Sequence, residues 1–197
     1  MHTYKPFIIV SGPSGSGKTT TVDIIIEEYG GYVDRIVTCT TRDQRPHEIA
    51  AKDYHYLTRE EFLAIKSDNG FVETSERKGN LYGTRMRDIE PIWDAGKIPI
   101  AAIDQVGVAC YRALFPGSLS LGLMPARMDE LAPRIQELRP GGTAKDTAER
   151  LALAGEEFLL LCENADFIIA APTGKVPSMV KRMMMLIKHY KTYGKTF

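Results

Sequence analysis

A glycine-rich loop close to the start of the chain, Gly12-Pro-Ser-Gly-Ser-Gly-Lys-Thr19, constrains the fold more than any other feature. It matches the pattern G-x-x-x-x-G-K-[ST], comes directly after the apolar run Phe7–Val10 and precedes a helix-like segment, Thr19–Tyr29. Glycines let the backbone wrap closely around a phosphate, so that successive N–H groups and the helix N-terminus point at its negative charge. The loop therefore predicts a site for a nucleoside triphosphate or a closely related anion.

The spacing also assigns roles within the loop. Lys18 can reach the phosphate that is transferred, and Thr19 offers its hydroxyl to Mg²⁺, which we expect as the cofactor that accompanies the triphosphate. The residues expected to hold the triphosphate belong to the loop and the first helical turn: Gly12, Ser14, Gly15, Gly17, Lys18, Thr19 and Thr20. The motif leaves the destination of the phosphate open, because water, a small acceptor or no acceptor at all would suit a protein with this loop.

Further apolar runs of strand length occur at residues 98–103, 119–124 and 167–171. Between the last two, apolar residues from Ala148 to Cys162 recur at helical spacing. Strands that alternate with helices imply a parallel sheet whose two faces are covered. We therefore predict an α/β chain with the P-loop NTPase fold, in which helices flank a parallel core sheet.

Two polar segments interrupt this alternation. Residues 35–88 are rich in Thr, Arg, Tyr and acidic side chains and contain the capping box Thr58-Arg-Glu-Glu61, which predicts an inserted small mixed α/β lobe. Residues 125–150 contain several arginines and the breaker run Pro140-Gly-Gly142, which indicates a helical lid. The expected organisation is a single domain over residues 1–197, with a core at 1–34, 89–124 and 151–197, a lobe at 35–88 and a lid at 125–150.

Composition excludes several classes of protein. The 197 residues are 44% hydrophobic and 25% charged, ordinary values for a globular protein that rule out a disordered chain. Lys and Arg number 25, as do Asp and Glu, and this neutrality argues against a protein that coats nucleic acid. The charges are not evenly distributed along the chain. Residues 175–197 contain six basic and no acidic residues, so residues 1–174 contain 19 basic and 25 acidic ones. The basic end of the chain predicts a helix with a solvated face.

The three cysteines and four histidines are scattered, so we expect no zinc site and a reducing compartment. No apolar stretch approaches the ~20 residues that cross a bilayer, and the polar N-terminus does not resemble a signal sequence. We therefore expect a cytoplasmic protein with neither a membrane nor a nucleic-acid partner. No pattern in the sequence sets its oligomeric state.

The polar segment carries a series of short motifs: Thr38-Cys-Thr-Thr-Arg42, Arg45, Glu48, Lys52-Asp-Tyr54, Phe71-Val-Glu73 and Gly79-Asn-Leu-Tyr-Gly-Thr84. In this order and spacing, behind a P-loop, they resemble the acceptor site of the guanylate kinase family. The resemblance extends over nearly the whole chain and implies a site for GMP in this segment.

The resemblance implies a division of roles that suits the chemistry. The acceptor phosphate carries about two negative charges and would be held by guanidinium groups and phenols, those of Arg42, Arg45, Tyr54 and Tyr82. Guanine presents N1–H and N2–H₂ donors beside its O6 acceptor, so one carboxylate can accept from both donors while hydroxyls donate to O6. The matching positions are Glu73 for the carboxylate, Thr38 and Thr84 for the hydroxyls, Asp104 near the exocyclic amine, and Glu48 also in the GMP site.

By the same resemblance, arginines of the lid clamp the donor phosphates and the group in transfer. The matching residues are Arg134, expected at the donor nucleotide, and Arg139 and Arg150, expected to be catalytic together with Lys18 and Arg42. The match of Arg139 requires one inserted residue next to it. A single arginine that stabilises such a transition state can accelerate transfer by about 10³-fold or more.

Four positions depart from the family pattern. Where the family has Leu-Asp-Ile-Asp, a variable residue and Gln-Gly, this chain has Ala101-Ala-Ile-Asp-Gln-Val-Gly107. Ala102 thus replaces a carboxylate at the end of a core strand, near the expected Mg²⁺ and its waters, and Val106 replaces the glutamine. Thr38 stands in place of a serine and keeps the hydroxyl, and Ala171 replaces an asparagine near the donor base. We expect weaker binding of the metal or an altered preference for the donor.

The expected activity is the transfer of the γ-phosphoryl group of ATP to GMP, and also to dGMP, giving GDP and ADP with Mg²⁺. The partners of the chain are then two small molecules, ATP and the guanine nucleotide. Two alternatives remain open: a non-catalytic module of the same fold that binds phosphopeptides, and a kinase that acts on another small acceptor such as a ribose bisphosphate.

Overall fold

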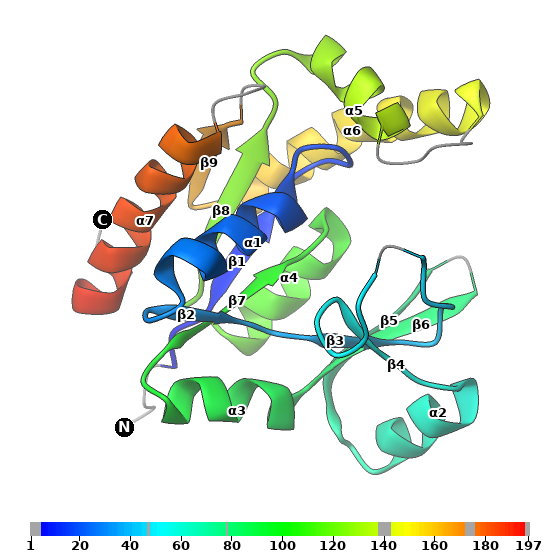
Figure 1. Ribbon diagram of the computed structural model, residues 1–197, viewed down its shortest axis with the longest axis vertical. Helices are drawn as coiled ribbons and strands as arrows, with labels where there is room; N and C mark the ends of the chain where they lie inside the picture. Colours follow the sequence, from blue (N-terminus) through cyan, green and yellow to red (C-terminus); the bar gives the residue numbers. More distant parts are fainter. Residues whose placement is uncertain (1–4, 47, 78, 138–142, 172–175, 196–197) are drawn as a thin grey trace. The chain divides into compact units, whose positions relative to one another are not determined.

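The computed structural model describes residues 5–46, 48–77, 79–137, 143–171 and 176–195. The chain divides into two compact units, one made of Met1–Gly30 and Ile100–Phe197 and the other of Gly31–Pro99. Parallel strands form the centre of the first unit, and a four-stranded mixed sheet forms that of the second (Figure 1).

The parallel sheet is organised around β1 (Ile8–Ser11), whose four residues are all buried. β1 pairs in parallel with β7 (Ile98–Ala102) on one side and with β8 (Leu119–Met124) on the other, and β8 pairs in parallel with β9 (Phe167–Ala170). A short edge strand, β2 (Val33–Arg35), completes the order β2-β7-β1-β8-β9. A central strand covered on both faces needs apolar side chains on both, which is why Phe7–Val10 reads as a continuous apolar run.

Helices cover both faces of the parallel strands. α1 (Lys18–Tyr29) and α7 (Val176–Tyr193) lie side by side on one face, and α4 (Gln105–Leu114) and α6 (Ala144–Asn164) lie on the other (Figure 1). α7 buries a stripe of residues at helical spacing: Met179, Met183, Ile187 and Tyr190. The predicted fold class, a P-loop α/β core with flanking helices, is confirmed. None of the helices in the described part of the chain is both long and apolar enough to span a membrane.

The second unit has the strand order β4-β3-β6-β5. β3 (Thr38–Thr40) pairs in parallel with β4 (Tyr54–Tyr56), whereas β6 (Asn80–Arg85) runs antiparallel to both β3 and β5 (Phe71–Arg77). α2 (Arg59–Ser67) contributes Phe62 to a small core with Cys39 and Leu81, and α3 (Met86–Asp94) follows β6. Phe62 and Phe71 stack with their ring centroids 4.3 Å apart.

The predicted capping box begins α2. The side chain of Thr58 accepts a hydrogen bond from the backbone N–H of Glu61 (3.1 Å), and the carboxylate of Glu61 accepts one from the N–H of Thr58 (2.7 Å). Two N–H groups that the helix itself cannot pair are thereby satisfied.

Replacing Thr58 by alanine is expected to lower the free energy of unfolding by about 1 kcal/mol, the usual cost of losing an N-cap side chain. Urea denaturation followed by circular dichroism measures the change. Thr192→Ala is the matched control, because the Thr192 hydroxyl only donates back to Lys188 O within α7. Equal losses of stability in the two variants would show that the cap contributes nothing beyond an ordinary exposed threonine.

Candidate nucleotide-binding and phosphoryl-transfer site

The glycine-rich loop between β1 and α1 adopts a backbone shape that requires glycine. Gly12 has a φ of 149° and Gly15 a φ of 81°, in the region that residues with a side chain rarely adopt. A Cβ atom on Gly12 would lie 2.3 Å from the carbonyl oxygen of Leu123, and one on Gly15 would lie 3.1 Å from Cγ1 of Ile135. A side chain at Gly12 would therefore collide with the backbone of β8, and one at Gly15 would press against Ile135 of α5.

The loop ends where α1 begins, and this helix start suits an anion. The residue before Lys18, Gly17, has a left-handed backbone and makes no side-chain cap, and the first turn contains no acidic residue. The positive end of the helix dipole is therefore not neutralised by a carboxylate from the first turn. Thr19 and Thr20 lie exposed in this turn. A phosphate is the natural ligand of such a helix start.

Lys18 folds back over the loop. Its ammonium donates to the carbonyl oxygens of Gly12 (2.7 Å) and Pro13 (3.0 Å), so the positive charge is held at the loop itself. Since the Lys18 stem is flexible and its ammonium has three donors, it can turn from these carbonyls to a phosphate bound in the loop.

The residues of this region fit Mg²⁺ as a partner of the nucleotide. Mg²⁺ keeps several waters and is usually bound by one or two protein groups together with substrate phosphates, so the exposed hydroxyl of Thr19 is a suitable ligand. Within the described ranges, no group of three His, Cys, Asp or Glu side chains could hold a metal ion. The end of β7 carries Ala102, beside Val10 of β1, where a carboxylate would have added a further oxygen. Any Mg²⁺ site here would therefore depend largely on the phosphates of the nucleotide.

Two residues of α6 contact Ser14 at the tip of the loop. Nη1 of Arg150 donates to the Ser14 hydroxyl (2.9 Å), and the backbone N–H of Ser14 donates to the carboxylate of Glu157 (3.3 Å). The two contacts lie on one face of α6, because positions seven residues apart are separated by about two helical turns. Arg150, a predicted site residue, is thus placed directly at the loop.

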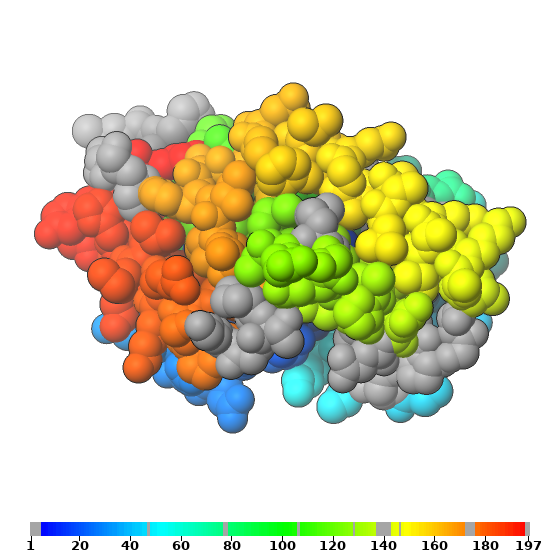
Figure 2. Space-filling model, turned by 90° about the horizontal axis from the view of Figure 1, so that it is seen from above, coloured from blue at the N-terminus to red at the C-terminus, as the bar shows by residue number. Residues whose placement is uncertain are grey.

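The segment before α6 also packs at the loop. Leu131 and Ile135 of α5 (Leu131–Glu137) form a small core with Ala154 of α6, and Figure 2 shows α5 (yellow-green) beside α6 (yellow to orange). A 3-10 turn, η1 (Met128–Glu130), precedes α5. Arg134 is held by the carboxylate of Glu130 and donates to the carbonyl oxygen of Ala171 (3.1 Å). Arg139, the other arginine predicted in the lid, lies outside the described residues.

In the second unit, three predicted base-reading residues fall in one row across the sheet together with Tyr54, which is predicted to hold the phosphate. Tyr54 of β4 lies opposite Thr38 of β3, and Glu73 of β5 lies opposite Thr84 of β6. Cys39 opposite Gly83 sets the register between β3 and β6 and brings the two threonines to neighbouring positions. The pairing of four short strands thus gathers residues that are up to 46 positions apart in the sequence.

Glu73 and Thr84 are bonded to each other. The hydroxyl of Thr84, a buried residue, donates to Oε1 of Glu73 (2.9 Å). A hydroxyl has a single proton to donate, so in this arrangement Thr84 orients the carboxylate rather than donating to a ligand. Thr38, which is half-buried, is then the hydroxyl better placed to donate to a carbonyl such as O6 of guanine.

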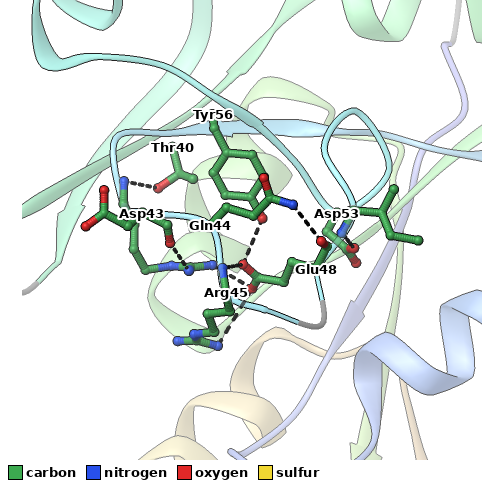
Figure 3. Close-up of polar contacts among 9 residues, drawn as sticks. Thr40, Asp43, Gln44, Arg45, Glu48, Asp53 and Tyr56 are labelled. Carbon is green, nitrogen blue, oxygen red and sulfur yellow. Dashed lines mark hydrogen bonds and ion pairs between the residues drawn. The ribbon is translucent and has the colours of Figure 1, made fainter.

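Arg42 and Arg45 both contact one carboxylate, that of Glu48, and Figure 3 shows Arg45 and Glu48 close together. Oε1 of Glu48 accepts from Nη2 of Arg42 (2.7 Å) and lies 3.8 Å from Nη1 of Arg45, while Oε2 accepts from the Arg45 backbone N–H (2.8 Å). The guanidinium of Arg42 also lies over the Tyr54 ring, 5.4 Å from its centroid, and Tyr54 contacts Tyr82 edge-on. All the predicted phosphate-holding side chains therefore belong to one cluster.

Burial alone would raise the pKa of Glu48, but hydrogen bonds from Arg42, from the Arg45 N–H and from Tyr56 outweigh it and hold the pKa at about 2. Desolvation by burial alone would lower the pKa of Arg42, but its hydrogen bonds and charge interactions with Glu48 and Tyr82 raise this pKa. Burial, followed by the proximity of Tyr82, raises the pKa of Tyr54, which stays a neutral phenol. At neutral pH the cluster contains two guanidinium groups and one carboxylate, and hence an excess of positive charge.

Asp104 belongs to the first unit, where it caps α4. Its Oδ1 accepts a hydrogen bond from the Gly107 N–H (3.0 Å), which explains why α4 begins at Gln105.

Two residues that contact the site were not singled out in the sequence. Tyr56 lies two positions after Tyr54 on the same strand, so the period of two already predicts that both rings share a face. Glu157 lies seven positions after Arg150 on a predicted amphipathic helix, so the spacing predicts that both side chains lie on the same face of that helix. Neither position lies in one of the short motifs.

Comparison with known proteins shows which family this chain resembles. The family model described as Guanylate kinase matches residues 4–190. The guanylate kinase of Bdellovibrio bacteriovorus is 37% identical over 151 residues, which cover 77% of this chain and 80% of the relative. That of Lactococcus lactis is 33% identical over 186 residues, which cover 93% of this chain and 88% of the relative.

A solved structure resembles the chain over nearly its full length. The crystal structure of guanylate kinase from Anaplasma phagocytophilum superimposes with a TM-score of 0.74, covers 97% of this chain and 88% of its own, and is 24% identical. At this identity the likeness shows that the two chains share a fold.

Proposed function

The chain belongs to the guanylate kinase family and is a nucleoside monophosphate kinase, and on this premise we propose that it transfers the γ-phosphoryl group of ATP to GMP, giving ADP and GDP. The observation that carries the choice of acceptor is the hydrogen bond between Thr84 and Glu73, which holds a carboxylate in a fixed orientation in the second unit. The N1–H and N2–H₂ groups of guanine can donate to such a carboxylate together. Adenine lacks these paired donors and would leave it unsatisfied.

On the donor side, the loop backbone from Gly12 to Thr20 would hold the phosphates of ATP, and Lys18 would follow the phosphate in transfer. Arg150 is placed at the loop by Ser14 and would neutralise charge that develops on the transferring group. Arg134 is held at the end of β9 by Ala171 O and would contact the donor nucleotide. We assign Arg139 the same kind of role as Arg150 on the family resemblance alone.

On the acceptor side, Arg42, Arg45, Tyr54 and Tyr82 would hold the phosphate of GMP. An oxygen of that phosphate attacks the γ-phosphorus of ATP, and the bond from this phosphorus to the β–γ bridging oxygen breaks to release ADP. The charge in such a transition state is spread over the equatorial oxygens, so catalysis consists mainly of positioning and neutralisation. Thr38 and Asp104 would complete the recognition of the base, and Glu48 would act within the phosphate cluster.

Thr19, together with the donor phosphates, would hold Mg²⁺, and the ion would offset part of the negative charge of the triphosphate. We include dGMP among the acceptors, because the proposed contacts are to the base and the phosphate and none is to the ribose.

We also propose that the chain is one domain with three parts: a core, a lobe at residues 35–88 and a lid at residues 125–150. Cys39, Cys110 and Cys162 form no disulfide, which suits a reducing compartment, the cytoplasm.

Release of ADP from Mg·ATP, measured with a panel of acceptors, tests the proposal. We expect turnover with GMP and dGMP, and kcat/KM values lower by at least about 10³-fold with AMP, UMP and ribose phosphates. Turnover with AMP but not GMP would overturn the argument from Glu73. If no acceptor supports turnover and a phosphopeptide binds instead, the chain is a binding module and not a kinase.

A further inference from the structure

Tyr56 donates a hydrogen bond from its hydroxyl to Oε2 of Glu48, at 2.8 Å. The same oxygen accepts from the Arg45 N–H, and the other carboxylate oxygen accepts from Arg42. Three donors from two parts of the chain, the segment 42–45 and Tyr56, therefore bind both oxygens of one carboxylate. Figure 3 shows the contacts of Arg45 and Tyr56 with Glu48. Hydrogen bonds to both oxygens restrict the orientation of the carboxylate.

The register of the sheet explains why Tyr56 can make this contact. Thr40, the last residue of β3, lies opposite Tyr56, the last residue of β4, and the chain turns after Thr40 to place Arg42 two residues later. Tyr54 and Tyr56 share a face of β4, with their ring centroids 6.0 Å apart. The Tyr54 ring therefore lies under the guanidinium of Arg42, and the Tyr56 hydroxyl reaches the Glu48 carboxylate that binds this guanidinium.

The backbone around Glu48 is braced as well. The amide of Gln44 donates to the Glu48 carbonyl oxygen (2.6 Å), and the Glu48 N–H donates to the Arg45 carbonyl oxygen (3.0 Å). Nη1 of Arg42 donates to the Asp43 carbonyl oxygen (2.6 Å). With one edge of its guanidinium tied to Glu48 and Asp43, Arg42 keeps further N–H donors in a fixed plane, as bidentate recognition of a phosphate requires.

We propose that Tyr56 is a positioning residue for the acceptor phosphate, acting through Glu48 on the guanidinium of Arg42. Its hydroxyl does not touch the substrate; it holds the Glu48 carboxylate, and the carboxylate holds the guanidinium in the plane that meets the phosphate. A phenylalanine at this position would keep the packing of the ring and leave Glu48 with one donor fewer. The inference rests on the proposed function, in which this phosphate is that of GMP.

The test is Tyr56→Phe, in the full chain, with steady-state kinetics for GMP and for ATP. We expect KM for GMP to rise about five- to tenfold, which is the effect of one hydrogen bond, while KM for ATP changes less than about twofold. Tyr193→Phe, at an exposed position of α7, is the matched control and leaves both values unchanged. A general loss of structure would instead lower the melting temperature and affect both substrates.

A double-mutant cycle with Glu48→Ala, which removes the acceptor of the Tyr56 hydroxyl, shows whether Tyr56 acts through Glu48. We expect Tyr56→Phe to add less than about twofold to the KM for GMP once Glu48 has been replaced. If its full effect persists in the Glu48→Ala background, Tyr56 contacts the substrate directly and the inference is wrong. The inference would also be wrong if the Tyr56→Phe variant had the same KM for GMP as the wild type. Absence of GMP turnover in the unmodified chain would instead reject the proposed function.

Discussion

Replacing Lys18 by alanine is expected to lower kcat/KM for the transfer from ATP to GMP by at least about 10²- to 10³-fold, as the removal of one strong charge-stabilising donor does. Its ammonium lies at the loop, where it donates to the carbonyl oxygens of Gly12 and Pro13, and its flexible stem would let it follow a phosphate from donor to acceptor. The loss should fall mainly on kcat, since the charge it neutralises is greatest in the transition state. A coupled assay of ADP release measures it.

The control for this substitution is Lys181→Ala, which removes the same side chain from an exposed position of α7. Wild-type kinetics are expected for the control, and circular dichroism should show the same helix content for both variants. Comparable rates in Lys18→Ala and Lys181→Ala would mean that the loop lysine does not take part in transfer.

Replacing Glu73 by glutamine is expected to lower kcat/KM for GMP by about 10²-fold, the effect of losing a charged acceptor worth about 3 kcal/mol. The amide keeps one acceptor oxygen, to which Thr84 can still donate, but it turns an NH₂ group toward the donors of guanine. KM for ATP should stay within about twofold of the wild type, because Glu73 is proposed to contact GMP and not ATP. Kinetics with each nucleotide varied in turn measure both values.

Glu76→Gln serves as the control, because Glu76 lies on the same strand but is exposed. It removes the same charge from the molecule and should leave GMP kinetics unchanged. Equal effects of Glu73→Gln on GMP and on ATP would mean that Glu73 does not read the base.

The core of the fold could be predicted because local patterns determine it. A run of β-branched residues before a glycine-rich loop implies a buried strand, and the capping box at Thr58 marks the start of α2 in both sequence and structure. The arrangement of the second unit, which is built from short strands of mixed polarity, could not be predicted in this way. Its register depends on pairings between distant segments, such as Cys39 with Gly83, that no local period encodes.

The same distinction applies to the site. The sequence predicts which residues gather there, but it does not predict their mutual contacts. In the structure both oxygens of Glu48 accept hydrogen bonds, from Arg42, from the Arg45 N–H and from Tyr56. The Thr84 hydroxyl donates to Glu73. Such choices among partners depend on side-chain geometry and burial, which composition and spacing do not determine.

Following the γ-phosphoryl group itself tests the central claim most directly. ATP labelled in its γ-phosphate is incubated with Mg²⁺, GMP and the protein, and the products are separated and counted. We predict that the label appears in the β-phosphate of GDP, in equal amount to the ADP that is formed. Label that accumulates as inorganic phosphate, with GMP left unchanged, would contradict the account, because the chain would then transfer the phosphoryl group to water.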